Sequence, residues 1–433
     1  MPAGPQGVTV TALRIAVGAA VLVAVAAPAV STRALAQPAA GAGLPRVAVL
    51  PCTPHSFPQR TQRSFAIDPT AERVLYVGVE QEGFFKSTDG GLSWSRADTG
   101  IKAWPRADGS GRPCYEEFYD IVINPANPRE LCIAMAGGPG VIGTPSTAAN
   151  NGVYCSTDAA ATWTQRLSPG MNAAVLGLAA DTRDFATMYA GVNGGPCSNP
   201  PPACAPGTYF NSRGAIYKTI DGGATWTELD ALFQPDLRVN VLRIDARNPD
   251  VVVAASFSKL AGGGPGNFGE AVQIGVLRSI DAGETWSAST RGMNRDAREQ
   301  ALLDLDVAPQ NAMRVFVSAA SNRSYWSDDG GVTFHPTQRM ATVAFDPHDA
   351  RCLHLLGCNG ENIVESRDGG STWRANGRTP GFVSYEQGVP TRIAWSPSDP
   401  RHIFIAGPYA AVYDSTDGGA TWRPLLSSSK LPR

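Results

Sequence analysis

The sequence has 433 residues, with 36 Lys and Arg against 38 Asp and Glu, so its formal charge is close to zero. This balance gives no electrostatic case for nucleic acid or for an anionic membrane surface as a partner. Forty-six glycines and thirty-four prolines beside only 17% charged residues are typical of a turn-rich all-β domain.

Residues 1–36 have the pattern of a signal peptide. Arg14 precedes an apolar run over 15–30, and Ala34-Leu35-Ala36 supplies small residues for cleavage before Gln37. The run is short for a membrane span, which needs about 20 residues, although an uncleaved anchor is the alternative. We therefore expect cleavage after Ala36, a secreted or periplasmic protein, and a mature chain without a transmembrane span. Residues 37–62 are predicted to be an N-terminal linker with a strand-like run at 46–50.

One eight-residue pattern then recurs seven times, as in Ser366-Arg367-Asp368-Gly369-Gly370-Ser371-Thr372-Trp373, and we call each copy an octet. Asp and Gly suit a tight reversal, because the carboxylate accepts backbone N–H groups and glycine takes positive φ. The aromatic residue five positions after each aspartate is predicted to begin a strand and anchor it in the core. The octet aspartates, which we expect to be structural, are Asp89, Asp158, Asp221, Asp281, Asp329, Asp368 and Asp417.

Each octet is preceded by three short apolar strands and carries a fourth, with turn signals between them. No four-stranded unit buries both faces alone, so the units must stack and close into a ring. The sequence predicts one all-β domain over 63–426, a single seven-bladed β-propeller of four-stranded antiparallel blades, followed by a C-terminal tail at 427–433.

The spacing between octets is uneven, which locates the insertions. Three fall between second and third strands, at 137–151, 192–213 and 257–273. Others fall between blades, chiefly at 96–117, 287–300 and 374–390. These two kinds of connection emerge on one face of a propeller, and the octets turn on the other. We call the former the insertion face and expect function there, because loops on a rigid scaffold commonly carry it.

The octet resembles the Asp-box, or BNR repeat, of sialidases, xyloglucan-active endoglucanases, sortilin-type receptors and a photosystem II assembly factor. The resemblance covers about 63–426 and implies a fold without specifying an activity. Sialidases have six blades, xyloglucan-active enzymes two propellers and sortilin-type receptors ten blades. The assembly factor, one exported seven-bladed ring with an arginine-bearing face, is the most similar.

The eight cysteines suit an oxidising compartment. Cys132 and Cys155 fall near the same end of successive predicted strands and could form a disulfide, and Cys197 and Cys204 could close the loop between them. We expect no metal and no cofactor, because no CxxC or His-x₃-His spacing exists and the histidines fall away from the insertion face.

Carboxylates, arginines and aromatic residues of the insertion face are the candidate site. Ordinary solvated loop charges are the alternative reading, and Trp104 could equally be a ligand platform or a loop anchor. The predicted ligand-binding residues are Trp104, Arg106, Tyr115, Glu116, Glu117, Arg238, Tyr385 and Arg392.

We interpret the protein as a monomeric binding scaffold for a protein or carbohydrate partner. The alternative is a glycosidase, which needs two carboxylates about 5–9.5 Å apart, and the candidates are Glu116, Asp120, Asp296 and Glu386. A sialidase resemblance would imply an arginine triad, which Arg238, Arg339 and Arg392 could mimic, and a Tyr-Glu pair at Tyr385-Glu386.

Overall fold

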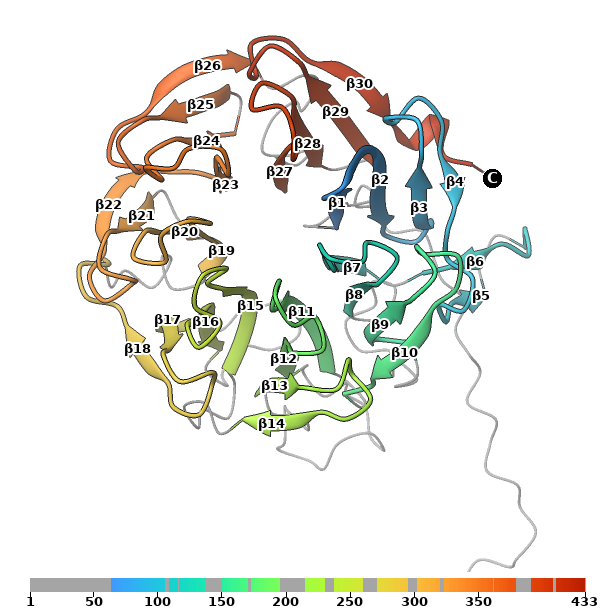
Figure 1. The fold of residues 1–433 in the computed structure, drawn as a ribbon, viewed down its shortest axis with the longest axis horizontal. Coiled ribbons are helices and arrows are strands. Elements are labelled where there is room, and N and C mark those ends of the chain that lie inside the picture. Colours follow the sequence, from blue (N-terminus) through green and yellow to red (C-terminus); the bar gives the residue numbers. More distant parts are fainter. Residues whose placement is uncertain are drawn as a thin grey trace, which may run out of the picture. The chain divides into compact units, whose positions relative to one another are not determined.

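The computed structural model describes residues 64–105, 109–115, 117–136, 150–169, 173–194, 215–229, 237–259, 271–294, 302–319, 323–360, 362–378, 391–407 and 410–432. They form seven four-stranded antiparallel sheets, each built from strands that are consecutive in the chain and hydrogen-bonded in chain order. The predicted seven-bladed propeller is confirmed (Figure 1).

The strands of the first four blades follow one another around the ring. Blade 1 holds β1 Phe65–Asp68, β2 Ala71–Val79, β3 Gly83–Ser87 and β4 Ser95–Arg96; blade 2 holds β7 Glu117–Ile123, β8 Leu131–Ala136, β9 Gly152–Ser156 and β10 Thr164–Leu167; blade 3 holds β11 Ala173–Ala180, β12 Met188–Gly194, β13 Ala215–Thr219 and β14 Thr227–Leu229; blade 4 holds β15 Leu237–Ile244, β16 Val252–Lys259, β17 Ala271–Ser279 and β18 Ser287–Ser289.

The last three blades complete the ring. Blade 5 holds β19 Leu302–Val307, β20 Val315–Ala319, β21 Arg323–Ser327 and β22 His335–Gln338; blade 6 holds β23 Thr342–Phe345, β24 Leu355–Cys358, β25 Asn362–Ser366 and β26 Arg374–Arg378; blade 7 holds β27 Arg392–Trp395, β28 Ile403–Gly407, β29 Ala411–Ser415 and β30 Arg423–Leu426. Between blades 1 and 2 a two-stranded ribbon pairs β5 Trp104–Pro105 with β6 Pro113–Cys114, and a short 3₁₀ helix, η2 Ser428–Lys430, follows β30.

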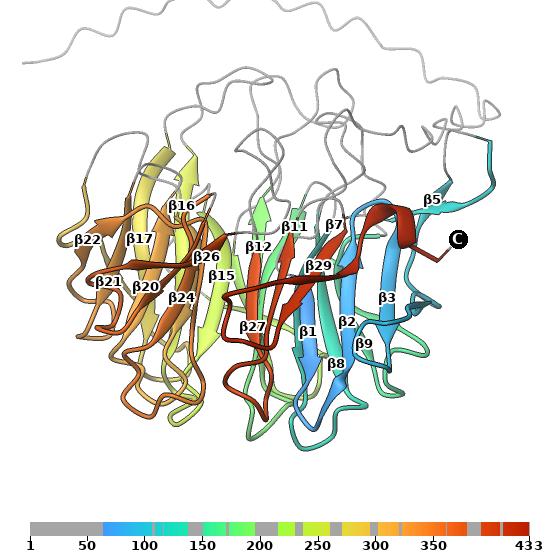
Figure 2. The ribbon, with the colours of Figure 1, turned by 90° about the horizontal axis from the view of Figure 1, so that it is seen from above.

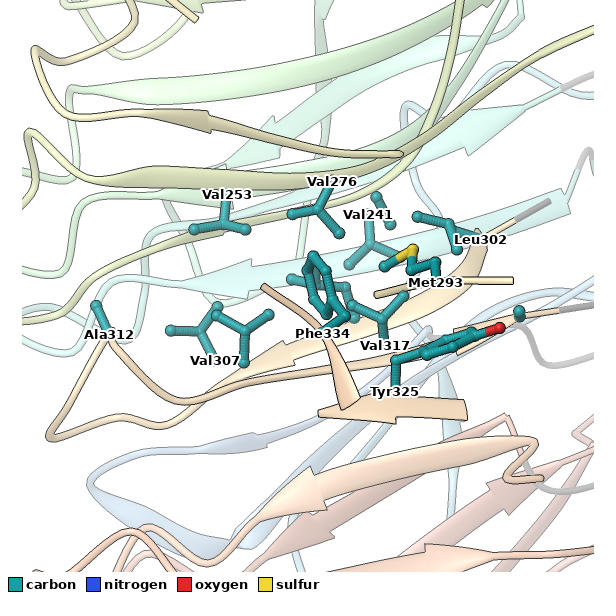
Figure 3. Close-up of a cluster of buried hydrophobic side chains, with 14 of the residues drawn as sticks. Val241, Val253, Val276, Met293, Leu302, Val307, Ala312, Val317, Tyr325 and Phe334 are labelled. Atoms are coloured by element: carbon teal, nitrogen blue, oxygen red, sulfur yellow. The ribbon is translucent and has the colours of Figure 1, made fainter. Parts of the chain in front are cut away.

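The core lies between blades rather than within them. Each of the seven interfaces between neighbouring blades has its own cluster of buried apolar side chains. Between blades 4 and 5, for example, Val241, Val253 and Val276 pack against Leu302 and Phe334 (Figure 3). A blade is therefore stable only between two neighbours, which explains why the sequence must repeat until the ring closes.

The ring closes where blade 7 meets blade 1. Phe65 and Phe404 pack with their ring centroids 5.8 Å apart inside the cluster that joins these blades. The Glu72 carboxylate accepts hydrogen bonds from the hydroxyls of Ser396 and Ser398, and these bonds lower the pKa of Glu72. Apolar packing and the hydrogen bonds of Glu72 thus join the first and last blades of the described chain.

The octets share a face with the turns between first and second strands. In every blade the residue after the octet aspartate donates its N–H to a carbonyl near the start of the second strand, as Gly369 does to Leu353. The second-to-third-strand and blade-to-blade connections leave the strands at the other ends (Figure 2). The described strand ends therefore define two faces, the octet face and the insertion face.

Cys132 and Cys155 are directly opposite each other on β8 and β9 and form a disulfide, as predicted. Cys114 is also disulfide-bonded, whereas Cys352 and Cys358 are free and buried. The disulfide fits a secreted protein. Among the described residues, no helix has the length and apolar character needed to cross a membrane.

Candidate functional site

The octet aspartates are held inside their own turns. The Asp89 carboxylate accepts hydrogen bonds from the Ser87 hydroxyl at 2.8 Å, the Ser93 N–H at 2.9 Å and the Ser93 hydroxyl at 2.6 Å. These bonds lower the pKa of Asp89 to about 2, and the bond from the Ser93 hydroxyl has the largest effect. Equivalent contacts from the octet hydroxyls and N–H groups surround Asp158, Asp221, Asp281, Asp329, Asp368 and Asp417.

A group of charged side chains from the first strands of four blades gathers at the centre of the ring. Its members, which we call the axial cluster, are Asp120 on β7, Arg243 on β15, Asp304 and Asp306 on β19, and Arg392 on β27. Arg243 lies between two of the carboxylates, with Nη1 3.5 Å from Asp120 Oδ2 and Nε 3.7 Å from Asp306 Oδ1. These two aspartates raise the pKa of Arg243 although burial opposes them.

The two aspartates of β19 are fixed by blade 6 as well as by charge. Asp304 accepts the Thr342 hydroxyl at 3.0 Å and its neighbour's N–H, from Leu305, at 3.0 Å. Asp306 accepts the Phe345 N–H at 2.8 Å. Burial raises the pKa of Asp306 and outweighs the opposite effect of Arg243. Both carboxylates thus serve the packing of β19 against β23.

Arg392 is the least satisfied member of the axial cluster. Its Nε is enclosed without a hydrogen-bond partner, and no ion pair within 4.0 Å joins its guanidinium to another described residue. Burial lowers the pKa of Arg392, and the positive charge of Arg243 adds to the effect.

A cavity of about 400 Å³ occupies the octet-face half of the central channel. Phe65, Ile121, Phe345 and Trp395 contribute to its apolar walls, and Asp306 and Arg392 supply its charged groups. Its lip is formed by the prolines that follow five of the first strands, namely Pro69, Pro125, Pro309, Pro347 and Pro397. The volume is within the range of small-molecule sites, roughly 300–1,000 Å³.

Five of the predicted site residues have described side chains, and one of them, Arg339, lies in the connection between β22 and β23. Asp120 and Arg392 are brought together in the axial cluster, on first strands that line the channel rather than in insertion-face loops. Tyr115 is buried and packs on Phe118 with ring centroids 6.3 Å apart. Glu117 begins β7 and accepts the Tyr119 hydroxyl at 2.5 Å.

The other predicted site residues are not brought into the described site. Trp104 lies on β5 opposite Cys114, and Arg238 lies on β15 opposite Phe257, but their side chains are outside the described part of the structure. Outside the described residues altogether lie Arg106, Glu116, Asp296, Tyr385 and Glu386, and the cysteines Cys197 and Cys204. Their roles stay predictions.

Sequence reasoning missed Arg243, Asp304 and Asp306. The signal was present, because Leu302-Leu303-Asp304-Leu305-Asp306-Val307 places two charges on alternate positions of a strand that is otherwise apolar. Alternate positions share one face of a strand. Charged residues at alternate positions of a first strand therefore indicate side chains that face the central channel of a propeller. There, water can hydrate them or a residue of opposite charge can pair with them.

The octet face also has a histidine cluster in blade 6. His354 Nδ1 lies 2.7 Å from Asp346 Oδ2, and its Nε2 lies 3.1 Å from Glu365 Oε1. Arg374 binds the same glutamate at 2.7 Å. Among the described residues, no group of three or more His, Cys, Asp or Glu side chains could hold a metal ion. The cluster is a network of compensated charges.

The similarity to known proteins is distant. No family model matches the chain. Xyloglucanase Xgh74A of Acetivibrio thermocellus is 24% identical over 245 residues, which are 51% of this chain and 24% of the relative. A Paenibacillus xyloglucanase is 23% identical over 189 residues, 34% of this chain and 18% of the relative. The chain thus spans a quarter or less of the curated relatives that it matches.

Two solved structures show the same kind of fold. An ancestral GH74 enzyme aligns with a TM-score of 0.58 and 13% identity, over 87% of this chain and 47% of the other. YCF48 from Cyanidioschyzon merolae aligns with a TM-score of 0.50 and 15% identity, over 84% of this chain and 97% of the other. At these identities the likeness concerns the propeller fold alone.

Proposed function

We propose that the protein is an exported Asp-box propeller that binds a protein or glycan partner through its insertion face. The supporting observation is that the channel-lining carboxylates already have structural partners. Asp120 and Asp306 contact Arg243, and Asp304 accepts the Thr342 hydroxyl. A carboxylate that neutralises a buried guanidinium is poorly placed to act as nucleophile or general base, so the described centre of the ring is better suited to a scaffold than to hydrolysis.

The geometry of the whole ring agrees with a scaffold. Seven apolar interfaces hold its blades together, and its octet carboxylates accept hydrogen bonds within their own turns. The proposed contact residues on the insertion face are Trp104, Arg106, Glu116 and Arg238. An aromatic plane beside a carboxylate and a guanidinium suits either a sugar ring or a peptide.

A glycosidase is the second candidate. Two observations favour it: burial raises the pKa of Asp306, as a general acid requires, and the curated relatives are xyloglucanases. Against it, the Asp306 carboxylate contacts Arg243 and accepts the Phe345 N–H, so it is already held in structural interactions.

Two experiments in sequence distinguish the scaffold from the glycosidase. Purified protein is first applied to a glycan array that includes xyloglucan oligosaccharides. It is then incubated with the oligosaccharides that it binds, and the products are analysed. We expect binding without release of shorter products. Trp104→Ala should weaken binding by about 1–3 kcal/mol, whereas Leu92→Ala, which removes an exposed side chain of an octet, should not. Hydrolysis that is lost in Asp306→Asn would favour the enzyme, and normal binding by Trp104→Ala, Arg106→Ala and Glu116→Ala would move the site elsewhere.

A further inference from the structure

We propose that Cys114 forms its disulfide with Cys52 and that this bond is a strap that holds blade 1 in the ring. Cys114 lies on β6, in the two-stranded ribbon between blades 1 and 2, where it is fully buried and disulfide-bonded (Figure 1). Cys52 precedes blade 1 in the sequence and lies outside the described residues. The strap ties the chain before blade 1 to the chain that follows it.

The partner of Cys114 follows from the other cysteines. The remaining described cysteines are either paired with each other or free. The partner is therefore one of the three cysteines outside the described residues, which are Cys52, Cys197 and Cys204. Cys197 and Cys204 are seven positions apart in one loop. Because the entropic cost of closing a loop rises with its length, a bond between these two is favoured, and it leaves Cys52 for Cys114.

The chain enters blade 1 close to Cys114. Ser64, the residue before β1, accepts the Gly78 N–H at 2.9 Å and donates its hydroxyl to the Gly78 carbonyl at 2.8 Å. Gly78 lies directly against Phe118, since a Cβ atom added there would be 2.4 Å from that of Phe118. Phe118 in turn packs on Tyr115, the neighbour of Cys114, with ring centroids 6.3 Å apart. The proposed partner is twelve residues before Ser64, and twelve extended residues span up to about 40 Å, so the thiol can reach the ribbon.

Blade 1 gains most from such a strap because only side chains hold it in the described part of the ring. Its four strands pair only with one another. An apolar cluster that includes Phe404 and the hydrogen bonds of Glu72 join it to blade 7, and packing such as that of Phe84 on Phe118 joins it to blade 2. Elements held in this way can open locally without unfolding of the whole protein. A bond between residues on either side of blade 1 restricts the detached chain more than the native one and so limits this opening.

The strap also makes the fold sensitive to the redox state of its compartment. When it forms, the thiols of Cys52 and Cys114 lose two protons and two electrons and their sulfur atoms become bonded. A second disulfide, on a protein oxidant or a small molecule, accepts the electrons and becomes two thiols. Oxidants of this class act outside the reducing cytosol. The strap is therefore open in a reducing compartment and closes in an oxidising one.

Tryptic peptide mapping of the full-length protein from an oxidising compartment distinguishes the possible pairings. After free thiols are blocked at acidic pH, cleavage after Lys and Arg except before Pro gives the peptides 47–60, 107–129 and 184–213. The first carries Cys52, the second Cys114 and the third both remaining cysteines. We expect 47–60 linked to 107–129 by a bond that reduction breaks, and 184–213 linked to neither. A link between 107–129 and 184–213, or a free Cys114 thiol, would overturn the proposal.

Hydrogen exchange measured by mass spectrometry tests whether the bond acts as a strap. In the double variant Cys52→Ser, Cys114→Ser we expect the amides of β2 and β3 to exchange at least about tenfold faster than in the parent, while those of β16 in blade 4 keep their rate. The matched control is Cys197→Ser, Cys204→Ser, which should leave blade 1 as protected as in the parent. Unchanged exchange in blade 1, or equal acceleration in every blade, would contradict the strap. The peptide mapping needs no variant and decides the pairing even if a variant does not fold.

Discussion

Removal of one octet aspartate should destabilise the protein by an amount that its hydrogen bonds predict. Asp329 is the most informative choice, because its carboxylate accepts the Ser327 hydroxyl at 2.8 Å and the N–H groups of Val332 and Thr333 at 3.0 and 2.8 Å. In Asp329→Ala the exposed Val332 N–H can turn to water, and Ser327 still accepts the Gly331 N–H. The partly buried Thr333 N–H loses its partner, so we expect a cost of about 1–3 kcal/mol.

Asp328 provides a matched control in the same octet. It is exposed, and no hydrogen bond or ion pair links it to another described residue. Asp328→Ala removes the same charge from a neighbouring position, so both variants alter the long-range field alike. Free energies of unfolding come from urea titrations followed by tryptophan fluorescence. If the two variants agree within about 0.5 kcal/mol, the spread of neutral surface substitutions, the octet carboxylate is not structural.

Three further predictions concern stability. The pKa values of Asp89 and Asp417 are about 2, below the unfolded value near 3.9. The contribution of these carboxylates to the free energy of unfolding is therefore complete above about pH 4 and is lost as the pH falls through 2. Unfolding free energies that stay constant from pH 5 to pH 2 would contradict this. Ala159 has φ of 62° in the second octet, so Ala159→Gly should stabilise by about 0.5–1 kcal/mol whereas Ala161→Gly should not, as thermal melts would show. Removal of the Cys132–Cys155 disulfide, whose cysteines are 23 residues apart, by double alanine substitution should cost about 3 kcal/mol; an unchanged urea midpoint would argue against it.

Much of the fold is encoded locally. An octet forms its turn from its own hydroxyl, carboxylate and glycines, all within eight residues, so each copy could be recognised without knowledge of the others. The first-strand turns are similar, because Asp68 accepts the N–H groups of Thr70 and Ala71. The pairing of Cys132 with Cys155 was also predictable, because antiparallel register between successive strands fixes which residues lie opposite.

The sequence by itself therefore determined seven units, their strand order, the face on which the octets turn and one disulfide, because each of these depends on contacts between neighbours in the chain. The axial cluster depended on ring closure. Asp120, Arg243, Asp306 and Arg392 come from blades 2, 4, 5 and 7, and no periodicity relates them. Only the closed ring brings their charges together and leaves a cavity beside Arg392. The reason is that the first strands of different blades face one another only across the central channel of the closed ring.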